Sequence, residues 1–259
     1  MRRPFVAIAA LSLAVLAAGC ATPPPASDPE ALAEFKANND PLEPLNRASY
    51  QVDLALDTLV LRPAAEAYGI VVPEPVRGRV RNVLDNLRLP VVFANDVLQA
   101  QPRRAGDSLA RFAINTTVGL LGIFDVATDW GYPAHYADFG QTLGRWGMKE
   151  GHFLYVPVLG PTNGRDLIGF GVDVAADPWG RIGQSNDPWV NAFRVARPTL
   201  NYLDVREGLI PVLDDIRKNS VDPYATLRSA YRQRREALIN YELDSFSRDP
   251  LGRRFGGGN

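Results

Sequence analysis

The sequence of 259 residues contains one cysteine and two histidines. A single cysteine excludes an internal disulfide and every metal site built from several cysteines. The sequence also lacks the motifs of phosphate-binding loops, serine hydrolases and zinc peptidases. His135 and His152, with Asp138 and Asp166, could be combined into a metal site or a triad, but two histidines near aspartates are common by chance. We therefore expect no metal, no cofactor and no catalytic residues.

The chain also lacks a surplus of either charge. Lysine and arginine number 28, aspartate and glutamate number 29, and the formal net charge is -1. Binding to nucleic acid needs a basic surplus that neutralises phosphates, so nucleic acid is not expected as a partner. Hydrophobic residues make up 46% and charged residues 22% of the chain, which is typical of globular proteins and excludes disorder throughout.

The first twenty residues have the pattern of a targeting signal. Two arginines precede an uncharged stretch at 4–19, and Cys20 directly follows Ala17-Ala18-Gly19. This ending resembles the bacterial lipobox, which implies that residues 1–19 are removed as a signal peptide and that Cys20 carries fatty acyl chains such as palmitate. The alternative is an uncleaved membrane anchor with an incidental cysteine. Sixteen uncharged residues are short for a spanning helix, which needs about 20.

Acylation at Cys20 would fix the protein to a membrane, because two or more acyl chains give stable anchoring. The next residue is Ala21 and not aspartate, which in lipoproteins of this kind implies transfer to the outer membrane. After this anchor we expect a flexible, proline-containing tether at 20–39, one mainly α-helical domain at 40–246 and a disordered glycine-rich tail at 247–259.

The helical domain should contain many breaks, because the chain holds 22 glycines and 21 prolines. Pro90 should interrupt a helix that begins at Pro75, and Asp107 or Ser108 should begin a helix that runs toward Ala127. Asp187-Pro188 and Asp222-Pro223 should each begin a further helix. The best candidate for a strand lies at 153–158.

Two stretches lack charged side chains, at 112–124 and at 152–164. Both are too short to span a bilayer. They are either buried core or a surface that lies in one leaflet of a membrane, and an anchor at Cys20 favours the second interpretation. The candidate membrane-facing residues are Val118, Leu120, Leu121, Ile123 and Phe124.

A glycine-rich segment follows at 140–151. Four glycines in twelve residues should prevent a stable helix and permit positive φ, while large apolar side chains between them argue against a solvated linker. We interpret the segment as a movable gating loop, and the alternative is a rigid turn that packs Trp146 into the core. The candidate gating residues are Gly140, Leu143, Gly144, Trp146, Gly147, Met148 and Gly151.

A series of short motifs, in order, resembles the MlaA family, also called VacJ. Their main members are the run at 40–47 (DPLEPLNR), Arg62-Pro63 with Tyr68, Asn82 with Asn86-Leu87, Asn95 with Leu98-Gln99, Arg111-Phe112 with Asn115-Thr116, the run at 138–144 (DFGQTLG), the run at 157–161 (PVLGP) with Arg165-Asp166, and the run at 222–224 (DPY) with Tyr231 and Arg234. Each motif is weak alone, but their number and order make the resemblance specific.

The resemblance implies a ring-shaped helical lipoprotein, embedded in the inner leaflet of the outer membrane, with an amphipathic central channel. It implies removal of phospholipids from the outer leaflet, which maintains lipid asymmetry, with trimeric porins and the periplasmic lipid carrier MlaC as partners. Polar residues that could line the channel, or could instead make local caps and turns, are Asn86, Asn95, Gln99, Asn115 and Thr116. The rival functions are a structural lipoprotein without transport and a lipid hydrolase.

Overall fold

The computed structural model describes residues 24–25, 27–29, 40–181 and 187–240. The expected signal peptide, Cys20, most of the tether and the tail lie outside the described residues. The described helices are α3 Glu43–Leu56, α4 Arg62–Val71, α5 Glu74–Leu98, α6 Pro102–Thr117, α7 Val126–Asp129, α8 Phe139–Arg145, α9 Gly164–Ala176, α10 Pro178–Arg181, α11 Pro188–Asn219 and α12 Pro223–Ile239, with a π-helical turn at Asp57–Leu61 and strands β1 Phe153–Val156 and β2 Gly160–Asn163. The expectation of a mainly helical domain is confirmed.

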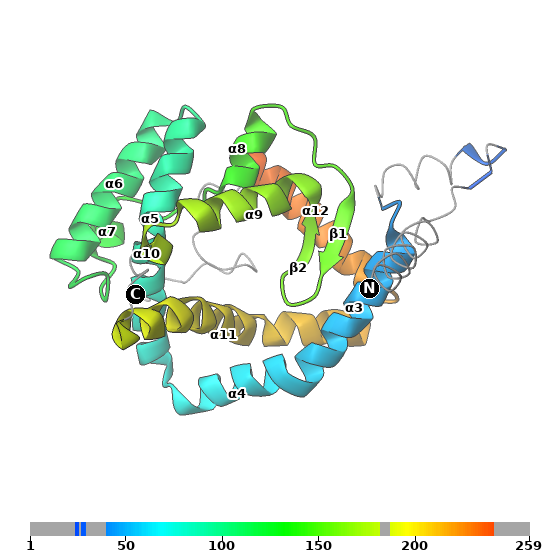
Figure 1. The fold of residues 1–259 in the computed structure, drawn as a ribbon, viewed down its shortest axis with the longest axis horizontal. Coiled ribbons are helices and arrows are strands. Elements are labelled where there is room, and N and C mark those ends of the chain that lie inside the picture. The colour runs from blue at the N-terminus through cyan, green and yellow to red at the C-terminus, as the bar shows by residue number, and fades with distance from the viewer. Residues whose placement is uncertain (1–23, 26, 30–39, 182–186, 241–259) are drawn as a thin grey trace, which may run out of the picture.

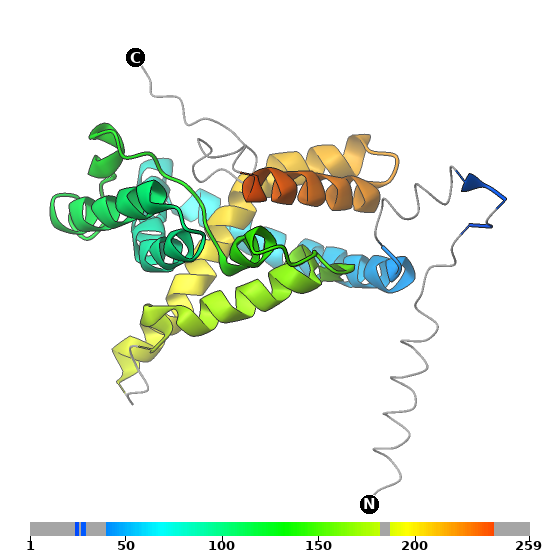
Figure 2. The same ribbon diagram turned by 90° about the horizontal axis from the view of Figure 1, so that it is seen from above.

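The described elements are arranged as a ring (Figure 1). Helices α4 and α11 lie side by side, α5 packs against α11 and α6, and α8 and α9 pack against each other. Strand β1 contacts α3, and α12 contacts α8 and β2, which completes the circuit. Figure 2 shows the same ring edge-on, with α12 and α9 on opposite sides of the ring. Within the described part of the chain, no helix is both long and apolar enough to cross a bilayer.

The expected break at Pro90 is wrong. Helix α5 runs from Glu74 to Leu98 with Pro90 inside it, and α11 contains two further prolines within 32 residues. An internal proline costs about 3 kcal/mol because it removes a backbone hydrogen bond and crowds the preceding turn. Packing of α5 against α6 and of α11 against α4 offsets this cost, which a count of prolines does not reveal.

Helix α6 also differs from expectation. It begins at Pro102, where the fixed φ of proline suits a first helical position, and not at Asp107 or Ser108. The Ser108 hydroxyl is buried and donates to the Asp96 carboxylate at 2.7 Å. The helix ends at Thr117 and does not reach Ala127, because Leu120 and Leu121 both adopt positive φ in the following turn.

The two aspartate-proline starts are confirmed. The Asp187 carboxylate caps α11 by accepting from the Trp189 amide, and the Asp222 carboxylate caps α12 by accepting from the Ala225 amide. The expected strand is confirmed in part: β1 ends at Val156 and pairs with β2 in an antiparallel hairpin.

An aromatic core holds the hairpin between α3 and α12. The buried rings of Tyr50, Phe153, Tyr155 and Tyr224 contact one another at centroid distances between 5.3 and 6.3 Å. Burial of such large side chains stabilises each by about 1.5–3 kcal/mol relative to exposure. This small core sits where the first and last described helices meet.

Buried ion pairs join distant parts of the chain elsewhere in the ring. The Asp57 carboxylate, on the π-helical turn, accepts from the Arg206 Nε of α11 at 2.6 Å and from the Arg217 Nη2 at 2.7 Å. The Asp40 carboxylate accepts from Arg228 at 2.7 Å. Since removing one partner leaves a buried charge uncompensated, such pairs fix which elements come together.

Candidate functional site

The turn at 118–124 presents apolar side chains to the surface. Val118, Leu120, Leu121, Ile123 and Phe124 are all exposed, and Leu121 reaches 71% exposure. The buried-core alternative is therefore wrong for these five residues. Their contact with a membrane stays a prediction.

Polar side chains beneath this turn hold it in place. The Asp125 carboxylate accepts from the Arg111 guanidinium at 2.8 Å and from the Asn115 amide at 2.9 Å. The Asn82 amide donates to the Ile123 carbonyl at 3.0 Å. A Cβ at Gly122 would lie 2.6 Å from the Asn86 Cβ, so only glycine fits there. The exposed apolar side chains are thus presented by a fixed scaffold.

The second uncharged stretch divides between core and surface. Phe153 and Tyr155 of β1 are buried in the aromatic core, which confirms the core interpretation for the strand. Val158 and Leu159, at the tip of the hairpin, are exposed. The uncharged stretch at 152–164 therefore contributes both to the aromatic core and to the exposed tip of the hairpin.

The expectation that glycines prevent a helix at 140–151 is wrong for its first half. Gly140, Leu143 and Gly144 lie in α8, which begins after the Asp138 side-chain cap. Helix α9 approaches so closely that a Cβ at Gly169 would lie 2.2 Å from the Gly140 nitrogen. The glycine at 140 therefore serves close helix packing, and helix formation follows from the cap and the tertiary contacts.

The second half of this segment is a turn. Gly147 and Gly151 adopt φ of 89° and 71°, as the glycine content predicts. Trp146 is 57% exposed and Met148 is also exposed, so the alternative that packs Trp146 into the core is wrong. The Trp146 indole instead donates to the Leu98 carbonyl of α5 at 3.0 Å. Movement of this segment stays a prediction.

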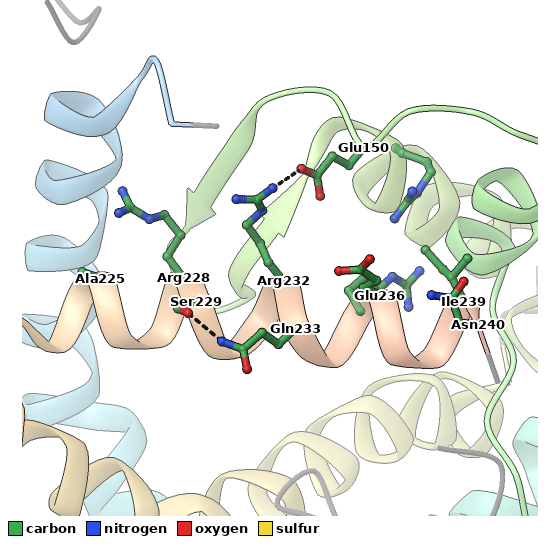
Figure 3. Close-up of a pocket in the computed structure, with 11 residues that line it drawn as sticks. Glu150, Ala225, Arg228, Ser229, Arg232, Gln233, Glu236, Ile239 and Asn240 are labelled. Atoms are coloured by element: carbon green, nitrogen blue, oxygen red, sulfur yellow. Dashed lines mark hydrogen bonds and ion pairs between the residues drawn. The ribbon is translucent and has the colours of Figure 1, made fainter. Parts of the chain in front are cut away.

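A cavity of about 750 Å³ lies along α12, beside the end of the turn at 146–151 (Figure 3). Three arginines of α12, Arg228, Arg232 and Arg235, line it at helical spacing of four and three residues, together with Arg165 of α9. Glu150 faces Arg232 across the cavity, with an ion pair of 2.9 Å. The wall is therefore polar and rich in arginine.

Carboxylates match these arginines. The Arg235 guanidinium donates to the Asp138 carboxylate at 2.6 and 2.7 Å and to Asp166 at 3.0 Å. Burial raises the pKa of Asp138, but the charge and hydrogen bonds of Arg235 outweigh burial and hold that pKa below its ordinary value. The arginines of the cavity are paired with carboxylates, so neither sign of charge is in large excess, which suits a zwitterionic or dipolar group.

Sequence reasoning missed this cavity. The signal was present as arginines at 228, 232 and 235, which share one face of a helix. Their carboxylate partners are far away in sequence: Asp40, Asp138, Glu150 and Asp166. No local sequence pattern therefore predicts these ion pairs.

The polar residues considered for a channel lining make structural hydrogen bonds. The Asn95 amide donates to the Asp173 carboxylate at 2.9 Å, and the Gln99 amide donates to the Thr142 hydroxyl at 2.9 Å. The Asn86 amide donates to the Thr116 hydroxyl at 3.0 Å. The three amide side chains are buried and their partners lie on other helices, so these bonds are neither local caps nor turns. A role in lining a channel stays a prediction.

His135 pairs with Asp96, whereas Asp138 and Asp166, the aspartates considered for a triad, pair with Arg235. The His135 Nε2 contacts both the Asp96 carboxylate, at 2.7 Å, and the Ser108 hydroxyl, at 3.1 Å. A triad needs the carboxylate and the hydroxyl on different ring nitrogens, so that one orients the ring while the other gives up its proton. Ser108 and Asp96 are also fully buried. Among the described residues, no group of three or more His, Cys, Asp and Glu side chains could hold a metal ion.

Comparison with known proteins gives consistent matches. The family model described as MlaA lipoprotein matches residues 38–238. A Haemophilus influenzae protein named intermembrane phospholipid transport system lipoprotein MlaA is 30% identical over 238 residues, or 90% of each chain. The Escherichia coli protein of the same name is 32% identical over 209 residues, which cover 79% of this chain and 80% of that one. An uncharacterised Rickettsia felis protein is 34% identical over 203 residues, 78% of each chain.

A solved chain also shares the fold. It comes from work on the structural basis for maintenance of bacterial outer membrane lipid asymmetry, and it superposes with a TM-score of 0.68. The two chains are 30% identical, and the match covers 78% of this chain and 99% of that chain.

Proposed function

Because this chain belongs to the MlaA lipoprotein family, we propose that it acts as an outer-membrane lipoprotein of an intermembrane phospholipid transport system. Its activity is phospholipid transport that maintains the lipid asymmetry of the outer membrane. The observation that carries this conclusion is the match to the family over residues 38–238, with the ring fold common to the solved relative.

The physical task is to move a lipid without exposing its chains to water. At roughly 0.8 kcal/mol per methylene, two acyl chains in water would cost on the order of 20 kcal/mol. A carrier must therefore cover the chains with apolar side chains while it hydrates the head group. The exposed turn at 118–124 is suited to acyl chains, and the arginine-lined cavity along α12 is suited to a head group. The turn would face the acyl chains of the membrane, and the cavity would form a polar part of the passage through the ring.

The lipid anchor belongs to the same proposal. Cys20 would carry the acyl chains, and the tether at 20–39 would connect them to the folded body, which begins near Asp40. The body would then lie on the periplasmic side of the outer membrane, with the turn at 118–124 in the inner leaflet. The absence of aspartate at position 21 supports transfer to the outer membrane.

The turn at 146–151 is proposed as the moving part of the passage. Positive φ at Gly147 and Gly151 allows backbone changes that other residues resist. Trp146 is exposed but is held to α5 by one hydrogen bond, which can break at modest cost. Gly140 and Gly144 belong to the fixed part, because α8 is packed against α9 and α12.

Two kinds of partner complete the proposal. Trimeric porins would hold the ring in the outer membrane, and the periplasmic carrier MlaC would receive the lipid. The family resemblance supports both.

One set of lipid measurements separates transport from its rivals. In a strain that lacks this protein, phospholipid should accumulate in the outer leaflet, and the intact protein should reverse this. A hydrolase would instead release fatty acid or lysolipid, and a structural lipoprotein would change neither. Unchanged outer-leaflet phospholipid in the deletion strain would contradict the proposal.

A further inference from the structure

A second, smaller hollow lies between α5, α8, α9 and α10. Its volume is about 250 Å³, and ten residues line it, of which only Asn95 and Asp173 are polar. This groove is separate from the arginine-lined cavity along α12, with which it has no lining residue in common.

Four residues that line the groove, Ala94, Leu98, Val172 and Ala176, are exposed, so the groove is an open hollow on the surface. Ala94 on α5 and Ala176 on α9 contribute only a methyl group each. Closer to the start of α9, the tight contact of Gly169 with Gly140 holds the helix against α8, so α9 cannot shift to fill the space. Contiguous exposed apolar surface often marks a binding site, so this groove is a candidate for an apolar ligand.

The two polar residues of the groove are already satisfied within the protein. The Asp173 carboxylate accepts from the Asn95 amide at 2.9 Å and from the Phe139 backbone amide at 2.9 Å. The Asn95 side-chain oxygen accepts from the Thr142 hydroxyl at 2.8 Å. Because these groups face one another, the groove favours an apolar occupant over a polar one.

The mouth of the groove meets exposed apolar surface. Leu98 and Val172 line the groove and are exposed, and Val97, one helical turn from Ala94, is exposed beside them. Trp146 lies at this rim: its ring contacts Phe139 edge-on at 5.9 Å, and its indole bonds to the Leu98 carbonyl. Exposed apolar side chains therefore border the groove next to the turn at 146–151.

We propose that this groove seats one acyl chain of a phospholipid in transit, with Trp146 at its rim. The inference rests on the proposed function, and it names the part of the substrate that each hollow takes. A flexible hydrocarbon chain fits a groove that is lined mostly by apolar side chains, and the exposed apolar side chains at its rim favour entry of such a chain. The polar head group would remain outside the groove.

Photo-crosslinking of the full-length lipoprotein tests this assignment. The protein is placed in vesicles of phosphatidylethanolamine and phosphatidylglycerol that contain phosphatidylethanolamine with a diazirine either near the end of an acyl chain or in the head group. After illumination, labelled peptides are mapped by mass spectrometry. The acyl probe should label residues 90–98 and 172–176, and the head-group probe should not.

Filling the groove supplies the matched variants. Ala94→Leu and Ala176→Leu should each lower acyl labelling of the groove by about tenfold, since a few extra methyl groups in a tight apolar site discriminate by that order. Ala113→Leu is the control, because Ala113 is an exposed alanine of α6 that does not line the groove. Thermal melting of each variant checks that the fold is intact.

Three outcomes would overturn the assignment. They are acyl labelling in the unaltered protein that maps away from the groove, labelling that persists in the filled variants, and equal labelling by the head-group probe. Mapping the acyl label in the unaltered protein needs no variant, so the assignment can be tested even if a variant does not fold. If the filled variants fully restore the lipid composition of the outer leaflet in a deletion strain, transport does not use the groove, and the proposed function is unaffected. A deletion strain without any lipid defect would instead contradict the proposed function itself.

Discussion

At the scale of single residues, Asp57 shows how much of the ring depends on charge. Its carboxylate is buried and is held by Arg206 and Arg217, both from α11. Burial raises the pKa of Asp57, but the hydrogen bonds and charges of the two arginines outweigh burial and set the pKa below its ordinary value. The charged form is therefore the form that the fold stabilises.

Replacing this carboxylate should destabilise the protein. In Asp57→Asn the two arginines lose their buried partner, and the free energy of unfolding should fall by about 3 kcal/mol. Asp129→Asn, at an exposed position of α7, should change it by less than about 0.5 kcal/mol. Denaturant unfolding measures both. Equal, small changes in the two variants would show that the pair does not stabilise the ring.

The same pair predicts a dependence on pH. A carboxylate with a lowered pKa contributes its full stabilisation above the unfolded value, near 4, and loses it as the pH falls further. The difference in stability between the unaltered protein and Asp57→Asn should therefore shrink as the pH is lowered from 7 to 3. A difference that stays constant over this range would contradict the assignment.

A third prediction at this scale concerns Cys20. The intact mass of the mature protein should begin at Cys20 and include the mass of its acyl chains. Cys20→Ala should block lipid attachment and reduce transport, because the body is no longer held at the outer membrane. A mature product without acyl mass would contradict the lipobox interpretation.

At the scale of elements, the contact between α8 and α9 depends on glycine. A Cβ at Gly169 would lie within 2.5 Å of two Gly140 backbone atoms, whereas a Cβ at Gly171 meets nothing within 4 Å. Gly169→Ala should therefore lower the free energy of unfolding by about 1–3 kcal/mol, because the helices must separate. Gly171→Ala should raise it by up to about 1 kcal/mol, because alanine favours the helix. Thermal melting that ranks the two variants in the opposite order would contradict this packing.

The turn at 146–151 should need freedom to move. A disulfide that joins it to α5, at a pair of positions with Cα atoms about 4.4–6.8 Å apart, should leave the fold intact and cause phospholipid to accumulate in the outer leaflet. Because Cys20 is the only native cysteine, the introduced pair is readily assigned. Reduction of the disulfide should restore transport. Unchanged lipid composition with the disulfide fully formed would remove the turn from the mechanism.

The elements also show where sequence reasoning works. Asp187 and Asp222 were predicted correctly because a cap acts within three residues of itself. Pro90 and Gly140 were predicted wrongly because local propensity was overridden by packing against helices that are distant in sequence. The apolar turn at 118–124 was found from composition. The arginine-lined cavity was not predicted, because the carboxylates that pair with its arginines come from four separate segments.

At the scale of the whole molecule, the apolar turn at 118–124 should set how the ring meets a membrane. Leu121→Asp should reduce labelling of this turn by a lipid-soluble carbene reagent without changing the melting temperature. Leu121 is exposed at φ 59°, a conformation that aspartate tolerates, so the fold has no reason to fail. Val221→Asp, at a fully exposed position between α11 and α12, is the control. Loss of cooperative melting in Leu121→Asp would favour a core role for the turn.

The ring closes through residues of α12, the last described helix. Asp40 pairs with Arg228, which follows it by 188 residues, and Asp138 pairs with Arg235, which follows it by 97 residues. A chain exported from its N-terminus would thus reach the periplasm with Asp40 and Asp138 without their arginine partners until α12 emerges. Folding should therefore be a single late event, and the nascent chain should depend on chaperones for most of its passage. Ending the chain before Pro223 should leave a product that periplasmic proteases remove, not a smaller functional ring.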